Sequence, residues 1–307
     1  MRLQFHGHID LPAHRSDGGF DHADIHPSTD RLYVAHTGND AIDVIDCAKD
    51  RYVESVPGFT AVAGALVSEA RGLVFTSNRG ENTVSIFEPL AERGAFKIPV
   101  GVKPNGLAFD PERGILSAAN VGDPSIPDSY SISVVDLAQR KLVAEVKAPG
   151  RTRWALYDPA IQMFFINIAS PARIVAIDAR DPTKLAKEYE VPATGPHGLD
   201  LDTATGRLLC ACDGGVLLAI DAASGLVLGD VPLSGAPDVI FLHPQSRRLY
   251  VAIGDPGVID VINVGTMRRE EVVQTEPGAH TLALDRKRSK VYAFLPQSHR
   301  AAVFVDA

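Results

Sequence analysis

Two short stretches of sequence decide the fold, namely Arg31-Leu32-Tyr33-Val34-Ala35 and, after a polar loop, Ile42-Asp43-Val44-Ile45-Asp46. Both are rich in Val, Ile, Leu and Tyr, and Gly, Asn and Asp bound them, which is typical of β-strands. The same pair recurs far along the chain as Arg248-Leu249-Tyr250-Val251-Ala252 and Ile259-Asp260-Val261-Ile262. A recurring pair of strands indicates a repeated β-unit.

The complete repeat holds four strands. The strand Asn105–Pro111 illustrates the first, and Tyr52–Val56 illustrates the fourth, which follows the pair quoted above. No segment shows sustained helical periodicity. Four strands in a repeat of about 42 residues are typical of a propeller blade, because one small sheet cannot bury both of its faces alone.

The repeat occurs seven times. The first strands begin near Asp21, Ala63, Asn105, Arg153, His197, Asp238 and His280. The longest interval contains an insertion, Val121–Ser131, and blade seven runs out after its third strand. The N-terminal stretch Leu3–Ile9 has no other partner, so we expect it to complete that blade and close the ring. The sequence thus predicts an all-β, seven-bladed propeller that forms a single domain over residues 1–307.

The strand pairs at 31–46 and 248–262 resemble the YVTN-type propeller repeat, and the resemblance extends over nearly the whole chain, with blades two, four and five more degenerate. Proteins with this repeat include surface-layer proteins, binding proteins, the haem propeller of certain nitrite reductases and some lyases. The resemblance therefore implies the fold and leaves the function open.

Composition excludes several classes of protein. The formal net charge is −8 and no basic face is clustered, which argues against nucleic-acid binding. No apolar run is long enough to span a membrane. The three cysteines do not resemble a disulfide framework. The N-terminal residues lack the apolar run of a signal peptide, so we expect a cytoplasmic protein, or a periplasmic one if a signal peptide has been removed.

The starts of the first strands converge on one mouth of the central channel, and several of these residues are polar. His197, Asp238, His280 and either Asp21 or His22 come from four consecutive blades. Two imidazoles with one or two carboxylates form a plausible site for a divalent metal ion, with Zn, Mn, Fe, Ni, Mg and Ca not distinguished. Two alternatives remain open, a metal-free polar substrate site and a solvated structural ring.

Other residues are candidates for substrate binding. Arg153 can grip a carboxylate or phosphate with two hydrogen bonds, and Asn105 lies one blade away. His36 ends the second strand of blade one at the same mouth, and Tyr130 gives the insertion an aromatic side chain that could cover the channel. Strand alternation predicts that Trp154, next to Arg153, points away from the channel.

The leading hypothesis is a metal-dependent hydrolase or lyase that acts on a small anionic or polyoxygenated substrate, with His197, His280 and Arg153 as catalytic residues. No phosphate-binding loop or nucleophile elbow is present, so no nucleotide cofactor is expected. The alternative is a non-catalytic YVTN-type scaffold that binds a ligand or a protein partner.

Overall fold

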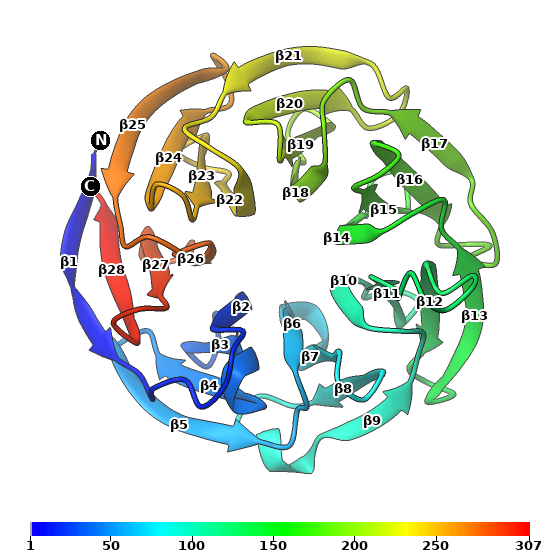
Figure 1. Ribbon diagram of the computed structural model, residues 1–307, viewed down its shortest axis with the longest axis horizontal. Coiled ribbons are helices and arrows are strands. Elements are labelled where there is room, and N and C mark those ends of the chain that lie inside the picture. Colours follow the sequence, from blue (N-terminus) through cyan, green and yellow to red (C-terminus); the bar gives the residue numbers. More distant parts are fainter. Residues whose placement is uncertain (1) are drawn as a thin grey trace.

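The computed structural model describes residues 2–307, whose strands form seven four-stranded antiparallel sheets arranged as blades around a common axis (Figure 1). Each blade runs outward from an inner strand to an outer strand in chain order, except the last. The predicted seven-bladed β-propeller is thereby confirmed. Within the described residues, no helix has the length and apolar character of a membrane span.

The strands of blades one to three, from the inner to the outer edge, are β2 (Phe20–His26), β3 (Arg31–His36), β4 (Ala41–Asp46) and β5 (Arg51–Pro57), then β6 (Val62–Ser68), β7 (Leu73–Asn78), β8 (Thr83–Phe87) and β9 (Phe96–Pro99), then β10 (Pro104–Asp110), β11 (Ile115–Asn120), β12 (Ser131–Asp136) and β13 (Lys141–Lys147). Three short 3-10 helices interrupt the loops, η1 (Thr37–Asn39), η2 (Glu69–Arg71) and η3 (Glu92–Gly94).

The strands of blades four to six are β14 (Thr152–Asp158), β15 (Met163–Ile168), β16 (Arg173–Asp178) and β17 (Lys187–Glu190), then β18 (Pro196–Asp202), β19 (Arg207–Cys212), β20 (Val216–Asp221) and β21 (Val227–Pro232), then β22 (Pro237–His243), β23 (Arg248–Ile253), β24 (Val258–Asn263) and β25 (Arg268–Gln274). Blade seven holds β26 (Thr281–Asp285), β27 (Lys290–Leu295), β28 (Arg300–Asp306) and, as its outer strand, β1 (Leu3–Asp10).

The two ends of the chain close the ring in blade seven. Strand β1 pairs antiparallel with β28, from Leu3 opposite Asp306 to Asp10 opposite Arg300. The backbone amide of Arg2 extends this ladder by donating to the carbonyl of Ala307 at 2.9 Å. The termini therefore lie side by side (Figure 1), as the unpartnered N-terminal stretch predicted. Pairing them leaves no open side to the ring.

The repeated tyrosine of the second strand ties each blade that carries it to the next. Tyr33, Tyr250 and Tyr292 are each fully buried. The Tyr33 hydroxyl donates to Glu92 at 3.0 Å, and that of Tyr292 donates to Asp50 at 2.8 Å. Both acceptors belong to the following blade, as does Asp306, the acceptor for Tyr250. Burying an aromatic ring together with a satisfied hydroxyl stabilises the packing between blades.

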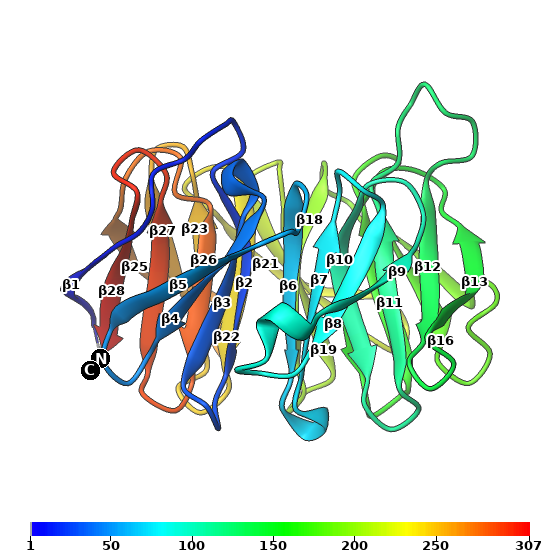
Figure 2. The ribbon, with the colours of Figure 1, turned by 90° about the horizontal axis from the view of Figure 1, so that it is seen from below.

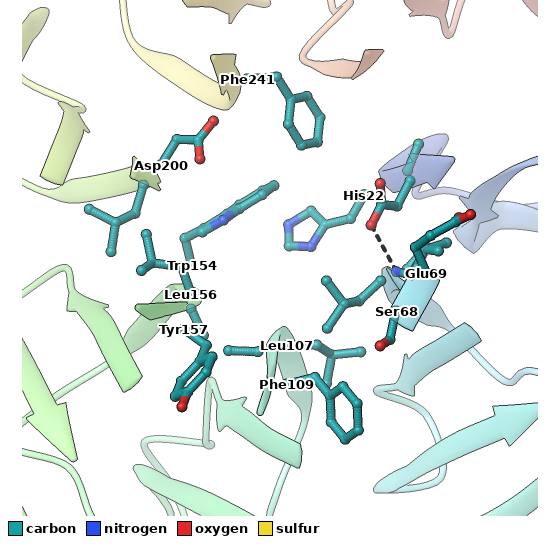
Figure 3. Close-up of a pocket in the computed structure, with 18 of the residues that line it drawn as sticks. His22, Ser68, Glu69, Leu107, Phe109, Trp154, Leu156, Tyr157, Asp200 and Phe241 are labelled. Atoms are coloured by element: carbon teal, nitrogen blue, oxygen red, sulfur yellow. Dashed lines mark hydrogen bonds between the residues drawn. The ribbon is translucent and has the colours of Figure 1, made fainter. Parts of the chain in front are cut away.

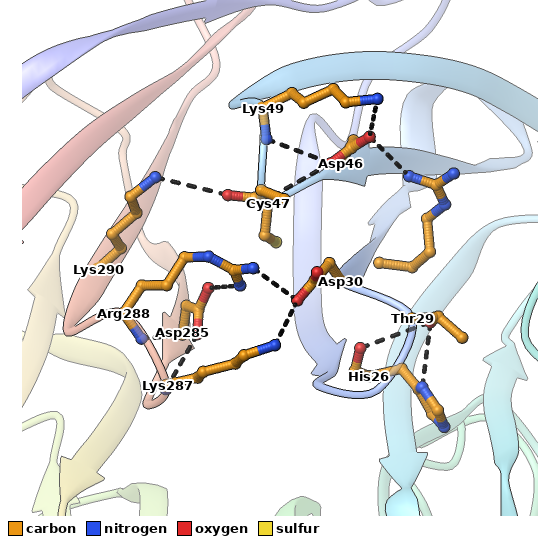
Figure 4. A network of polar contacts seen from close by, with 12 residues as sticks. His26, Thr29, Asp30, Asp46, Cys47, Lys49, Asp285, Lys287, Arg288 and Lys290 are labelled. Atoms are coloured by element: carbon orange, nitrogen blue, oxygen red, sulfur yellow. Dashed lines mark hydrogen bonds and ion pairs between the residues drawn. The ribbon is translucent and has the colours of Figure 1, made fainter.

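A polar network on the face opposite the mouth joins blade seven to blade one (Figure 4). Arg288 contacts Asp285 of its own turn at 2.9 Å and Asp30 of blade one at 2.8 Å. The two carboxylates raise the pKa of the Arg288 guanidinium, and Arg288 in turn holds the pKa of Asp30 below its usual range. The basic run Arg286–Lys290 forms the predicted turn, and part of it is engaged with the neighbouring blade.

Candidate functional site

The inner strands of blades one to six carry a β-bulge near their upper ends. We call the face with the loops between second and third strands the upper face; the insertion at 121–131 rises from it (Figure 2). In β14, the pairs Thr152–Ile168 and Ala155–Ile166 leave Arg153 and Trp154 opposite a single residue. Since a bulge re-aims a side chain, both residues line the channel. The prediction that Trp154 points away from it was wrong.

Strand β2 has the same bulge, and as a result both Asp21 and His22 line the channel, although the sequence predicted only one of the two. At the equivalent place in three other blades stands a glycine. A Cβ added at Gly64, Gly106 or Gly198 would lie 2.3 to 2.5 Å from the backbone oxygen of the next blade's channel residue. The glycines therefore permit adjacent inner strands to approach closely at the mouth.

The upper part of the channel is a chamber of about 180 Å³ lined almost wholly by polar side chains. Its lining consists of Asp21, His22, Arg79, Asn105, Arg151, Arg153, Trp154, His197 and Asp238. Six of these residues are candidates predicted from the sequence: Asp21, His22, Asn105, Arg153, His197 and Asp238. The structure therefore gathers most of the predicted site residues around one space.

His197 lies at the centre of a charged cluster. Its Nδ1 is 2.8 Å from Asp213 Oδ1, and its Nε2 is 3.1 Å from Asp238 Oδ1. Burial opposes protonation of His197, but attraction to Asp238 and hydrogen bonds to both carboxylates outweigh burial and raise its pKa to about 9. The same interactions outweigh the burial of Asp238 and hold its pKa well below the usual range. His197 is therefore an imidazolium at neutral pH.

The guanidinium of Arg153 lies in contact with this imidazolium. Its Nη1 lies 3.0 Å from His197 Nε2, and its Nη2 reaches Asp213 Oδ2 only at 3.4 Å. The guanidinium lowers the pKa of His197, against the effect of the two carboxylates. Two cationic groups thus lie in contact at the wall of the chamber, where an anion would be attracted to both.

Two further arginines complete the cationic side. Arg79 donates to Asn105 Oδ1 at 2.7 Å and lies 3.2 Å from Asp21 Oδ2. The backbone carbonyl of Arg151 accepts from the Ala169 amide at 2.8 Å, but its guanidinium has no hydrogen bond or ion pair to any residue of the described chain. Burial, followed by repulsion from Arg153 and Arg79, lowers the pKa of Arg151. The chamber therefore holds an arginine without a carboxylate partner, although the protein as a whole is acidic.

An aromatic layer forms the floor of the upper chamber. The rings of His22 and Trp154 lie 4.2 Å apart between their centroids, and Phe241 is 6.3 Å from Trp154 (Figure 3). Burial lowers the pKa of His22, so this imidazole is neutral at pH 7. His22 and Trp154 also line a second chamber beneath them. They thus separate an upper polar space from a lower, more apolar one.

The other predicted site residues lie outside the upper chamber. His280 donates from Nδ1 to the carbonyl of Gly278 at 2.8 Å, and it lines a wider depression of about 570 Å³ that also includes His197 and Asp238. His36 is fully buried, and its Nδ1 lies 2.7 Å from Asp43. Tyr130 packs against an apolar cluster of blades three and four.

The five predicted metal ligands do not converge on one point. Both ring nitrogens of His197 face carboxylates, and Asp21 is engaged with Arg79. Across residues 2–307, no group of three or more His, Cys, Asp or Glu side chains is arranged to hold a metal ion. Metal binding accordingly stays a prediction from sequence.

Three residues of the cluster are absent from the sequence prediction. Arg79 follows the second strand of blade two, Arg151 immediately precedes β14, and Asp213 follows β19. Each is a charged residue in a loop on the upper face. Their position in these loops could have identified them from the sequence, because the loops of the upper face meet around the channel in a propeller.

Known structures share this fold. The chain is similar to a chain of hydrazine synthase from Kuenenia stuttgartiensis, with a TM-score of 0.81, 14% sequence identity and 98% coverage of each chain. It is also similar to the WD40 β-propeller domain of Doa1, with a TM-score of 0.80, 12% identity and coverage of 100% of this chain and 97% of that one. No model of a protein family matches the sequence, and no curated protein matches it either. At these identities, the likeness shows the seven-bladed fold alone.

Proposed function

We propose that this protein binds a small organic anion in the upper chamber, with the carboxylate of the ligand held by Arg151 and Arg153, beside the imidazolium of His197. The observation that carries the proposal is the unpartnered guanidinium of Arg151, which lines the same 180 Å³ space as the Arg153–His197 contact. A guanidinium can hold a carboxylate with two parallel hydrogen bonds. A bound anion would also relieve the repulsion among the cationic groups.

Two carboxylates in the lining of the same chamber suit the rest of such a ligand. Asp21 and Asp238 are acceptors, with side-chain exposures of 17% and 25%, so hydroxyl groups of a polyoxygenated ligand could donate to them. We therefore favour a hydroxylated carboxylate, such as a sugar acid, over a purely apolar acid.

Titration calorimetry tests this proposal with gluconate, tartrate and inorganic phosphate, and with glucose as the uncharged counterpart of gluconate. We expect gluconate to bind and glucose to bind at least tenfold more weakly. Arg151→Gln should weaken gluconate binding about tenfold, which corresponds to about 1.4 kcal/mol. The matched control is Lys141→Gln, which removes an exposed cation on β13.

Two results would contradict the anion-binding proposal. One is that none of the three anions binds at millimolar concentration. The other is that gluconate binds the Arg151→Gln protein as tightly as the wild type. Either result would leave the non-catalytic scaffold of YVTN type, with a protein partner, as the better proposal. The resemblance to that repeat family rests on the strand pairs at 31–46 and 248–262.

Metal-dependent hydrolysis or elimination is the second candidate function. The observation that favours it is the wider depression on the upper face, where His197, Asp213, Asp238 and His280 all contribute to the lining. A divalent ion held there would polarise a carbonyl or activate a water molecule. Arg153, at the edge of this group, would orient an anionic substrate.

Elemental analysis separates the two candidate functions. The protein is purified without a chelator or a polyhistidine tag, beside the His197→Ala/His280→Ala double variant. Metal near one equivalent per chain that disappears in the double variant would support the metal-dependent enzyme and justify assays with lactones, esters and uronic acids. Equal metal contents in the two proteins would remove this candidate.

A further inference from the structure

The lower part of the channel is a second chamber of about 360 Å³, separated from the upper one by His22 and Trp154. It extends to the loops of the lower face, where Glu69 and Pro111 line it. This volume lies within the usual range for small-molecule sites, roughly 300–1,000 Å³. Neither of the functions proposed above uses this space.

Most of the residues that line the lower chamber are apolar or aromatic (Figure 3). The aromatic residues are Trp154, Phe241, Phe109 and Tyr157, and among the aliphatic residues are Leu66, Leu107, Leu156, Leu199 and Ile240. Trp154 and Phe241 are only partly buried, so their rings are available to a ligand. These surfaces suit the apolar body of a small molecule.

Two carboxylates interrupt this apolar lining. Asp24, on β2, accepts hydrogen bonds from the amides of Ile25 and Val67, each at 2.8 Å. Asp200, on β18, accepts from the amides of Leu201 at 2.7 Å and Leu242 at 2.6 Å. One amide of each pair belongs to the following blade, so both carboxylates are fixed at the wall of the chamber.

The negative charge of these carboxylates is poorly compensated. Among the described residues, neither Asp24 nor Asp200 has an ion-pair partner. Arg286 also lines the chamber, but its Nε donates to the Leu242 carbonyl at 3.3 Å. Burial raises the pKa of Asp24 to about 6 and also raises that of Asp200, and Arg286 only partly opposes this effect.

The other titratable groups that line the chamber do not supply positive charge. His22 is neutral at pH 7 because burial lowers its pKa. Tyr157 is a neutral phenol, since burial raises its pKa to about 12. Glu69 adds a further carboxylate at the lower opening. The chamber therefore holds three acidic groups and one cation, in contrast to the cation-rich chamber above it.

We propose that the lower chamber binds an organic cation, a substituted ammonium group carried on an aromatic or aliphatic body. The ammonium group lies between Asp24 and Asp200, where it neutralises carboxylates that water solvates incompletely. The body packs against Trp154 and Phe241, and the faces of these rings attract positive charge as well. This proposal does not depend on the function of the upper chamber.

Fluorescence provides a direct assay, because Trp154 is the only tryptophan in the chain and lines the chamber. The probes are 2-phenylethylammonium and its uncharged counterpart 2-phenylethanol, titrated into the wild-type protein at pH 7.5. We expect the ammonium probe to bind at least tenfold more tightly than the alcohol.

Variants locate the binding site. The Asp24→Asn/Asp200→Asn double variant should weaken binding of the ammonium probe at least tenfold and leave binding of the alcohol within about twofold. The control is the Glu190→Gln/Asp230→Asn double variant, which removes two exposed carboxylates from the outer strands β17 and β21. Circular dichroism verifies that each variant is folded.

Three outcomes would overturn the proposal. The first is that 2-phenylethylammonium does not bind the wild type, and the second is that 2-phenylethanol binds it equally well. The third is that the folded Asp24→Asn/Asp200→Asn variant binds the ammonium probe as tightly as the wild type. The first two comparisons use only the unmodified protein, so they remain decisive even if that variant fails to fold.

Discussion

His197 Nε2 lies 3.1 Å from Asp238 Oδ1 across the boundary between blades five and six. Together with Asp213, this carboxylate holds a proton on an imidazole that burial alone would deprotonate. The contact therefore links the stability of the ring to the charge of the upper chamber.

Stability should fall on the alkaline side because of this contact. The pKa of His197 is raised from its ordinary value of 6.5 to about 9. The stabilisation is thus fully present below pH 6.5 and is lost as the pH rises to 9. We expect the wild type to lose on the order of 1–3 kcal/mol between these values in urea unfolding. His197→Gln should lack most of this loss, and an unchanged pH profile in that variant would refute the assignment.

Closure of the ring should depend on a buried ion pair. Arg248 of blade six contacts Asp306 of β28, and their side chains are only 3% and 2% exposed. Asp306→Ala leaves the guanidinium buried with less compensation and removes the acceptor of Tyr250, so we expect a loss of about 3–5 kcal/mol in urea unfolding. Asp10→Ala breaks the ion pair to Arg300, but Asp10 is 84% exposed, and a loss of no more than about 1 kcal/mol is expected. Equal losses in the two variants would be inconsistent with this account.

The close approach of inner strands should make substitution of Gly198 destabilising. A Cβ at Gly198 would lie 2.3 Å from the carbonyl oxygen of Asp238. Gly198→Ala should therefore lower the melting temperature, with a cost of about 1–3 kcal/mol or more, and weaken gluconate binding by displacing Asp238 from His197. At Gly94 a Cβ meets nothing within 4 Å, so Gly94→Ala should be nearly neutral. A tolerated Gly198→Ala would show that the blades can separate there.

The lower chamber should also make stability depend on pH, in this case through a buried carboxyl group, Asp24. The pKa of Asp24 is raised from 3.8 to about 6, so its folded form binds a proton more tightly than its unfolded form. This contribution is present below pH 3.8 and is lost as the pH rises to 6. We expect Asp24→Asn to flatten the fall in unfolding free energy over this range by on the order of 1–3 kcal/mol. A slope identical to that of the wild type would contradict the raised pKa.

The repeat was sufficient to predict the fold, because each strand type recurs at a nearly constant interval. It gave the seven inner strands, the insertion at 121–131 and the role of Leu3–Ile9 in blade seven. It also gave the positions of the channel residues, since the starts of inner strands must converge at one mouth in any propeller.

Side-chain direction could not be predicted from the repeat. Regular alternation assigns Arg153 and Trp154 to opposite faces, and a single bulge in β14 turns both toward the channel. The loop residues Arg79 and Arg151 were missed for a related reason, because a strand pattern carries no information on where a loop side chain points. These two arginines make the upper chamber rich in cations. The chamber therefore differs from the predicted metal site chiefly in its charge.

The pairing of β1 with β28 also sets the order of events during synthesis. Strand β1 is synthesised before β28 and has to wait for it, because Leu3 lies opposite Asp306. Until then, the backbone edge and the apolar side chains of β1 lack their partner, and an unpaired strand can pair with other chains. We therefore expect the yield of folded protein to depend on translation rate and on chaperone access. A stable folded ring does not remove this dependence, because β1 is exposed before the ring exists.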